Sequence, residues 1–264
     1  MSGDRLTAEV VFDTSVVEDP GDAVLAGVAR VLAGAAPAWA DRMVAWSPEP
    51  RERREIDALA TLPDVVRGRT RWATQDRHTG NVELRGATAE LNVVVSVNSS
   101  PLARVGGRLL LSNGITLTGL REQVAGEPRT DWMRAVFGEI CAATRPVWGA
   151  LYSASEYRAK VMADGPVLRA LGRDFSRHLP GLFAGNYFGA PYVGLIGERV
   201  FERIGAPAAR KAADGWFVDV LHDPFAWRDD DSVTRNADLL AELGPECFFR
   251  KGAAEGRVTR APDW

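Results

Sequence analysis

The residue types most often used in acid–base catalysis are adjacent at His222 and Asp223. Histidine titrates near neutral pH and a carboxylate can orient its ring, so this pair could form part of a catalytic site. Pro224 follows, however, and Asp-Pro is a common turn arrangement. The sequence therefore favours a turn here, and an enzyme that uses His222, Asp223 or His178 in a site assembled by the fold is the alternative hypothesis.

Local motifs for metals, phosphates and nucleophiles are missing from the sequence. The nucleophile elbow G-x-S-x-G and the glycine-rich phosphate loops are absent. Ser153 lacks flanking glycines and instead has capping-box spacing with Glu156. Zinc sites need clustered ligands, whereas the histidines and cysteines share no ligand spacing: His78, His178, His222, Cys141 and Cys247. Both cysteines lie in apolar surroundings, which predicts buried structural thiols. We expect no metal, no cofactor and no catalytic residues.

Residues 185–197, GNYFGAPYVGLIG, combine four glycines, a proline and three aromatic residues without a charge. The only side chains here with acid–base or amide chemistry are Tyr187, Tyr192 and Asn186, and tyrosine is a poor base at neutral pH. The glycines permit close backbone approach, and Pro191 fixes one dihedral angle. We interpret the stretch as a packed structural turn, in which Asn186 bonds to backbone groups and the two tyrosines reach a binding surface.

An acidic run, Asp229, Asp230 and Asp231, follows Trp227 closely. Such a run is usually a solvated turn before a helix. Beside an aromatic residue it could also contact a basic protein surface, and long-range attraction would then mainly accelerate the encounter. Trp227 and the three aspartates are therefore candidate partner-binding residues together with Tyr187 and Tyr192.

The elements that position these residues begin with a predicted strand over 6–12 and a helix from a cap at Asp22 to about Gly34. A short strand is expected over 43–47. Residues 51–62 are charged on one side and apolar on the other, which predicts a short helix.

The clearest pattern in the chain is the alternation in 89–98, AELNVVVSVN, which predicts a half-buried strand. A second strand, RLLLS at 108–112, follows a loop that contains Gly106 and Gly107. Asn113-Gly114 predicts a turn or bulge before a strand over 115–120. These strands fit an antiparallel meander.

The second half of the chain mixes helical and strand patterns. A helix capped by Thr130 is expected over 131–144, followed by a strand over 147–152 and a helix that begins after Ser153. The remaining expectations are turns with a short helix over 164–181, a strand over 216–221, a helix capped by Ser232 over 232–243, a strand over 247–251 and an extended tail over 252–264. Without regular βαβ alternation, the class is α+β, with a mixed, largely antiparallel sheet and helices packed on it.

Composition allows one large domain or two small ones, and because no linker cleanly divides the chain we expect a single domain over 1–264. The 264 residues are 46% hydrophobic, which is enough for a sizeable core. The formal net charge is −3 and no long basic block occurs, so a nucleic-acid partner is not expected. No apolar run reaches membrane-spanning length and no signal peptide is visible. We therefore expect a cytoplasmic protein without a membrane partner.

The run 179–197, LPGLFAGNYFGAPYVGLIG, resembles a signature of bacterial proteins of the immunity protein 52 family, which belong to polymorphic-toxin systems and are similar to type VI secretion immunity proteins. The residues that carry the resemblance are Asn186, Tyr187, Phe188, Gly189 and Pro191, followed by Ile196 and Gly197. The later segments GWFVDVL, Asp223-Pro224 with Trp227, and Phe248-Phe249 follow in a similar order. The resemblance covers the C-terminal third well and the strand pair at 89–111 more loosely, whereas the N-terminal third carries no motif of the family.

This resemblance implies an α+β protein that binds a toxin made by the same cell and blocks it by occlusion, without a cofactor or catalytic residues. Asn186, Phe188, Gly189, Pro191 and Gly197 are then structural residues of the motif. The expected partner is the cognate protein toxin, and the sequence does not decide whether the protein forms a homodimer. A scaffold subunit is a third hypothesis.

Overall fold

The computed structural model describes most of the chain. The described residues are 4–16, 22–35, 43–47, 52–56, 61–70, 79–85, 91–98, 100, 102–111, 113–120, 129–164, 170–253 and 257–264. They divide into two compact units, Met1–Leu102 with Leu111–Pro146, and Ala103–Leu110 with Val147–Trp264. The expectation that both belong to one domain stays a prediction.

The first unit contains antiparallel strands in the order β1-β8-β5-β4-β2-β3. The predicted alternation of β5 is confirmed, because Leu91, Val93, Val95 and Val97 are buried between half-buried neighbours. The strands are β1 Arg5–Phe12, β2 Met43–Ser47, β3 Glu52–Ile56, β4 Thr79–Arg85, β5 Leu91–Asn98 and β8 Asn113–Leu120.

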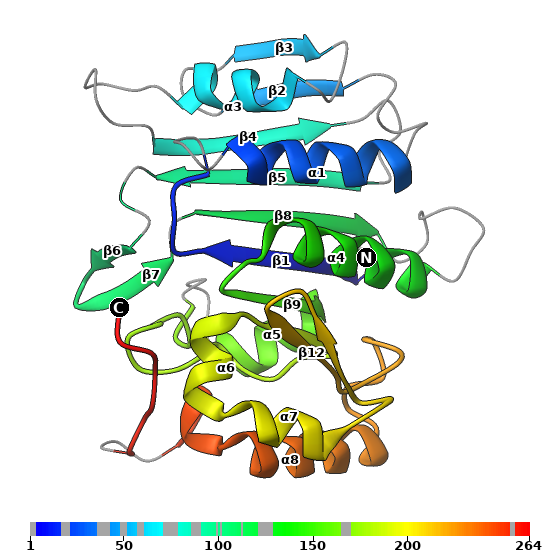
Figure 1. Ribbon diagram of the computed structural model, residues 1–264, viewed down its shortest axis with the longest axis vertical. Coiled ribbons are helices and arrows are strands. Elements are labelled where there is room, and N and C mark those ends of the chain that lie inside the picture. The colour runs from blue at the N-terminus through cyan, green and yellow to red at the C-terminus, as the bar shows by residue number, and fades with distance from the viewer. Residues whose placement is uncertain are drawn as a thin grey trace. The chain divides into compact units, whose positions relative to one another are not determined.

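Three helices accompany these strands: α1 Asp22–Ala35, α3 Leu62–Thr70 and α4 Arg129–Thr144. Figure 1 shows α1 and α4 over one face of the strands. Gly27 makes a close approach between these two helices possible, because a Cβ there would lie 3.4 Å from the Cγ2 of Thr144. Trp132 on α4 donates from its indole nitrogen to the carbonyl of Ala35, at 3.0 Å.

The second unit contains antiparallel strands in the order β11-β12-β10-β9. They are β9 Trp148–Ser153, β10 Gly185–Phe188, β11 Ala209–Ala212 and β12 Gly215–Asp219. Helices α5 Ala154–Val161, α6 Ala190–Ile196, α7 Glu198–Ile204 and α8 Asp230–Leu243 follow the strands in the chain, with a 3-10 turn over Pro245–Cys247. Together the two units make this an α+β protein, as predicted.

A separate two-stranded ribbon is formed by β6 Leu102–Val105 and β7 Arg108–Leu111 (Figure 1). Gly106 and Gly107 connect the strands with φ angles of 56° and 79°. Positive φ at both central residues defines the tight hairpin turn whose twist matches the strands, and glycine adopts it without strain. The loop at Gly106 and Gly107 was predicted from the sequence, whereas strand β6 was not.

Two predictions for the first unit were wrong. The helix predicted over 51–62 is wrong for the described residues there: Glu52–Ile56 is strand β3, which pairs with β2 from Met43↔Ile56 to Ser47↔Glu52, and α3 begins only at Leu62. Long-range pairing overrides the local helical pattern here. Asn113-Gly114 is not a turn, because both residues lie in β8 and pair with β1. Strand β4 was missed altogether.

For the segment 164–181, the described residues 164 and 170–181 contain bends and turns but no helix, and 165–169 lie outside the described residues, so the short helix stays a prediction. Two other predictions for the second unit were wrong. Residues 247–251 do not form a strand, because only Phe248 bridges to Leu179. Helix α8 begins at Asp230, two residues before the expected cap Ser232, and its N-cap is Asp229.

Candidate functional site

The glycine- and aromatic-rich stretch 185–197 is a central strand followed by a short helix, and not a turn. All four residues of β10 are buried between β9 and β12. Gly189 is the N-cap of α6, and Pro191 lies in the first turn of this helix, where its missing N–H costs nothing. Gly197, at φ 97°, ends α6 and precedes α7. The stretch therefore builds the core of the second unit.

Asn186 uses its buried amide to hold the backbone that enters β10. Its Oδ1 accepts a hydrogen bond from the backbone N–H of Phe183 at 3.0 Å, and its Nδ2 donates to the carbonyls of Phe183 at 2.8 Å and Val218 at 3.3 Å. The side chain is fully buried, so these three bonds satisfy groups that would otherwise be costly to bury. Asn186 thus makes the backbone bonds that the sequence suggested.

Tyr187 and Tyr192 do not reach the surface, since each is 0% exposed. The hydroxyl of Tyr187 donates to Oδ1 of Asp214 at 3.1 Å, and its ring lies 5.0 Å from that of Phe217. Burial raises the pKa of Tyr192 well above its ordinary value, and its ring meets Trp264 edge-on. Both are core residues, so the prediction that they contact a partner is wrong for this fold.

The segment from Trp227 to Asp231 lies at the surface. The indole nitrogen of Trp227 donates to Oγ of Ser155 at 3.1 Å, which leaves the ring half-buried and oriented. The guanidinium of Arg228 lies 4.5 Å from the centre of that ring. Asp229, Asp230 and Asp231 are exposed around the N-terminus of α8, where the helix dipole favours negative charge. Of the predicted partner-binding residues, these four remain accessible.

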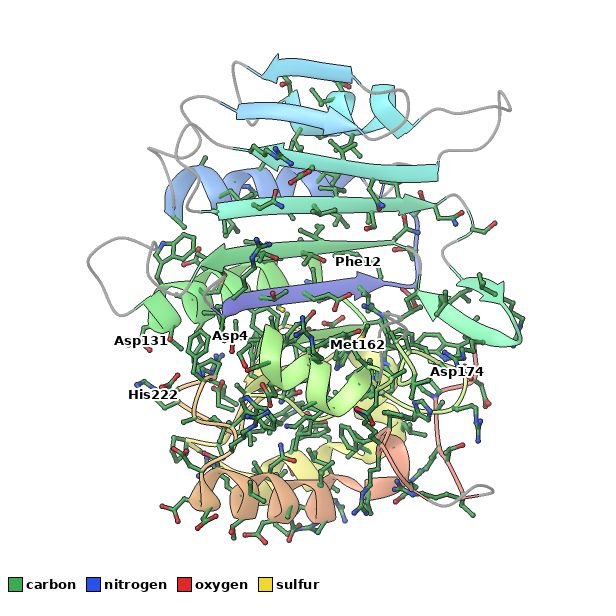
Figure 2. The ribbon with its side chains drawn as sticks, turned by 180° about the vertical axis from the view of Figure 1, so that it is seen from behind. Asp4, Phe12, Asp131, Met162, Asp174 and His222 are labelled. Atoms are coloured by element: carbon green, nitrogen blue, oxygen red, sulfur yellow. The ribbon has the colours of Figure 1, made fainter. Side chains whose placement is uncertain are left out.

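The histidines of the second unit are not brought together. His178 is 7% exposed, and burial lowers its pKa. Its backbone N–H donates to the carbonyl of Asp174, while His222 is exposed and lies on the opposite side of the unit from Asp174 in Figure 2. The turn predicted at Asp223 is confirmed, because its Oδ1 accepts from the N–H of Phe225 at 2.9 Å. His78 lies outside the described residues.

The carboxylate nearest to His178 is occupied with structural bonds. Oδ1 of Asp174 accepts hydrogen bonds from the N–H of Leu109 at 3.1 Å and from the hydroxyl of Ser176 at 2.6 Å. Within the part of the chain that the structure describes, no group of histidines, cysteines and carboxylates is arranged to hold a metal ion. In that same part, no helix is long and apolar enough to span a bilayer.

A buried ion pair on α5 was missed in the sequence analysis. Nζ of Lys160 donates to Oε1 of Glu156 and to the carbonyl of Leu182, both at 2.7 Å. Burial raises the pKa of Glu156, and the charge of Lys160 opposes that rise. The i,i+4 spacing of the two residues could have revealed the pair, but the sequence did not show that this face of α5 is buried. Ser153 caps the helix as predicted, accepting from the N–H of Glu156 at 3.2 Å.

The two cysteines are buried free thiols, as predicted. Burial raises the pKa of Cys247 to about 11, so the thiol is protonated at neutral pH and is a poor nucleophile. Cys247 therefore serves as packing, and its backbone carbonyl accepts from the N–H of Leu179 at 2.7 Å.

Comparison with known proteins gives a likeness of fold. No protein-family model matches the chain, and no curated protein matches it. A solved structure, the Pseudomonas aeruginosa T6SS protein PA0821, is similar with a TM-score of 0.58 and 12% sequence identity, covering 99% of this chain and 80% of that chain. Membership of the immunity protein 52 family stays a prediction. At this identity the likeness shows that the chain shares its fold with a type VI secretion protein.

Proposed function

We propose that this chain is an immunity protein that binds a cognate bacterial toxin and neutralises it by occlusion, without catalysis. The observation that carries the proposal is the fold shared with the T6SS protein PA0821 over 99% of this chain. The resemblance of residues 179–197 to immunity proteins of toxin systems supports the proposal independently, because that resemblance lies in the sequence and not in the fold.

The accessible residues of the candidate site suit a protein partner. Trp227 is half-buried and held by its bond to Ser155, so its ring can be covered by a partner with little loss of side-chain freedom. Tryptophan is enriched among residues that dominate binding energy. Asp229 to Asp231 supply a compact negative charge that would attract a basic surface of the toxin.

Co-expression tests this proposal directly. The candidate toxin is the product of the neighbouring reading frame, expressed from an inducible promoter with this chain, with an empty vector, or with an unrelated immunity protein of similar size. We expect growth only with this chain, and a stable complex between it and an inactive toxin variant. Growth arrest that this chain does not relieve, together with no complex, would show that the proposal is wrong.

A further inference from the structure

The β6–β7 ribbon ends in an exposed tip, residues 104–108, with the sequence Arg-Val-Gly-Gly-Arg. Val105 at this tip is 59% exposed. Arg104, Gly106 and Gly107 are exposed as well. By contrast, Leu109 and Leu111 at the base of the ribbon are buried. The ribbon is therefore held at its base and presents the apolar side chain of Val105 beside Arg104 at its end.

The base of the ribbon is fixed by three hydrogen bonds to residues 170–175. The N–H of Leu109 donates to Oδ1 of Asp174 at 3.1 Å, and the carbonyl of Leu109 accepts from the N–H of Phe175 at 2.9 Å. Nη1 of Arg108 donates to the carbonyl of Ala170 at 2.9 Å. Figure 2 shows Asp174 beside the ribbon. With the tight glycine turn, these bonds preorganise the tip, which reduces the entropy lost when a partner binds.

The charge of the ribbon is opposite to that of the chain. No aspartate or glutamate occurs from Leu91 to Arg121, and the ribbon carries Arg104 and Arg108, whereas the whole chain has a formal net charge of −3. No hydrogen bond or ion pair involves the guanidinium of Arg104 within the described residues. A guanidinium free to form paired bonds with a carboxylate, next to an exposed valine, fits a cleft that has an apolar floor and an acidic rim.

We propose that this tip inserts into a carboxylate-lined cleft of the cognate toxin. The inference rests on the proposed function and names the chemistry of the surface that is occluded. A protein partner is favoured over nucleic acid because the tip offers one available guanidinium, that of Arg104, beside the apolar Val105, whereas phosphate backbones are bound by extended arrays of positive charge.

The test uses the full chain with two tip variants and two controls. Arg104→Glu reverses the charge and Val105→Glu removes the apolar contact. Arg250→Glu is the matched control for the first, because Arg250 is also an exposed arginine of the second unit. Val258→Glu is the matched control for the second, because Val258 is 78% exposed. Thermal unfolding of all four variants, compared with the wild type, establishes that they are folded.

The dissociation constant for an inactive toxin variant is the main readout, with rescue of growth as the second. We expect each tip variant to weaken binding by about tenfold or more and each control by less than about twofold. If the wild type binds the toxin and both tip variants bind it with the same affinity, the proposed insertion of the tip is wrong. The proposed immunity function would then still stand. If the wild type neither binds nor protects, the proposed function and this inference both fail. Binding of single- or double-stranded nucleic acid that Arg104→Glu abolishes would overturn the protein partner.

Discussion

At the scale of single residues, the Glu156–Lys160 pair is the contact whose loss should destabilise the protein most. Lys160→Met would leave Glu156, whose side chain is fully buried, without its opposite charge. Breaking a buried pair in this way costs about 3–5 kcal/mol of unfolding free energy. The variant that changes both residues, Glu156→Gln with Lys160→Met, should recover much of the loss because no buried charge remains.

Urea denaturation of the full chain measures these differences. Lys211→Met is the matched control, because Lys211 pairs with Glu198 at 2.6 Å but both side chains are exposed. Exposed pairs contribute little to stability, because water screens both charges. Equal losses for Lys160→Met and Lys211→Met would contradict the claim that burial makes the first pair important.

His178 should make stability depend on pH. Its pKa in the folded protein is lowered by burial and by Arg177, and raised in part by Asp174. The unfolded chain therefore binds the proton first as the pH falls, so stability is retained above about pH 6.5 and is lost as the pH falls from there towards the lowered pKa of the folded state. His178→Gln should flatten this dependence.

The measurement is the unfolding free energy between about pH 8 and pH 5, over which a histidine titrates. His222→Gln is the control, because His222 is exposed. We expect the wild type and His222→Gln to lose stability in parallel on the acid side and His178→Gln to lose less. Three parallel curves would show that His178 does not carry the effect.

Asn186 and its neighbour Tyr187 differ in how far their roles could be predicted from the sequence. The amide of Asn186 was a sound candidate for backbone bonding, because an uncharged polar residue in an apolar stretch needs partners. The position of Tyr187 depends on β9 and β12, which pair with β10 from both sides and come from distant parts of the chain. No local pattern contains that information, so exposed and buried tyrosines look alike in the sequence.

At the scale of elements, the close approach of β10 and the first residue of β12, Gly215, gives a sharp prediction for glycine. A Cβ on Gly215 would lie 2.4 Å from the carbonyl oxygen of Phe188 and 2.5 Å from Oη of Tyr187. Because one neighbour is backbone, Gly215→Ala must displace a strand, and we expect a loss of about 1–3 kcal/mol or more.

Gly194 in α6 is the matched control, because a Cβ there meets nothing within 4 Å. Alanine is favoured over glycine inside a helix, so Gly194→Ala should stabilise the protein by up to about 1 kcal/mol. The two variants make the same chemical change, but the midpoint temperature of unfolding should fall for Gly215→Ala and rise for Gly194→Ala. A shift in the same direction for both would contradict the close approach.

Elements with strong local periodicity were predictable, whereas those formed by pairing were not. Strand β5 follows from the alternation of Leu91 to Val97, and α1 and α4 from apolar residues at helical spacing. Strand β3 has a charged sequence, ERREI, and forms through its register with β2. Phe248 has the composition of a strand residue but makes a single bridge with Leu179, because the 3-10 turn before it redirects the chain.

At the scale of the whole molecule, two surfaces of opposite charge belong to the second unit. The acidic segment from Trp227 to Asp231 precedes α8, and the basic ribbon tip projects from residues held by Asp174. If both surfaces stay solvent-exposed in the complex with the toxin, both charges act at long range and are screened by salt. If the ribbon tip is enclosed, its contacts act mainly on dissociation, because enclosed charge pairs must be broken before the partner leaves.

The association and dissociation rates therefore distinguish the roles of the two surfaces. Neutralising Asp229, Asp230 and Asp231 together to asparagine should lower the association rate constant with the toxin by about tenfold at low salt, an effect that shrinks as salt rises. The dissociation rate should change little, in contrast to Arg104→Glu. Asp238→Asn, at an exposed position on the same helix, is the control for charge on α8. A triple variant that associates at the wild-type rate at every salt concentration would show that the acidic segment does not attract the toxin.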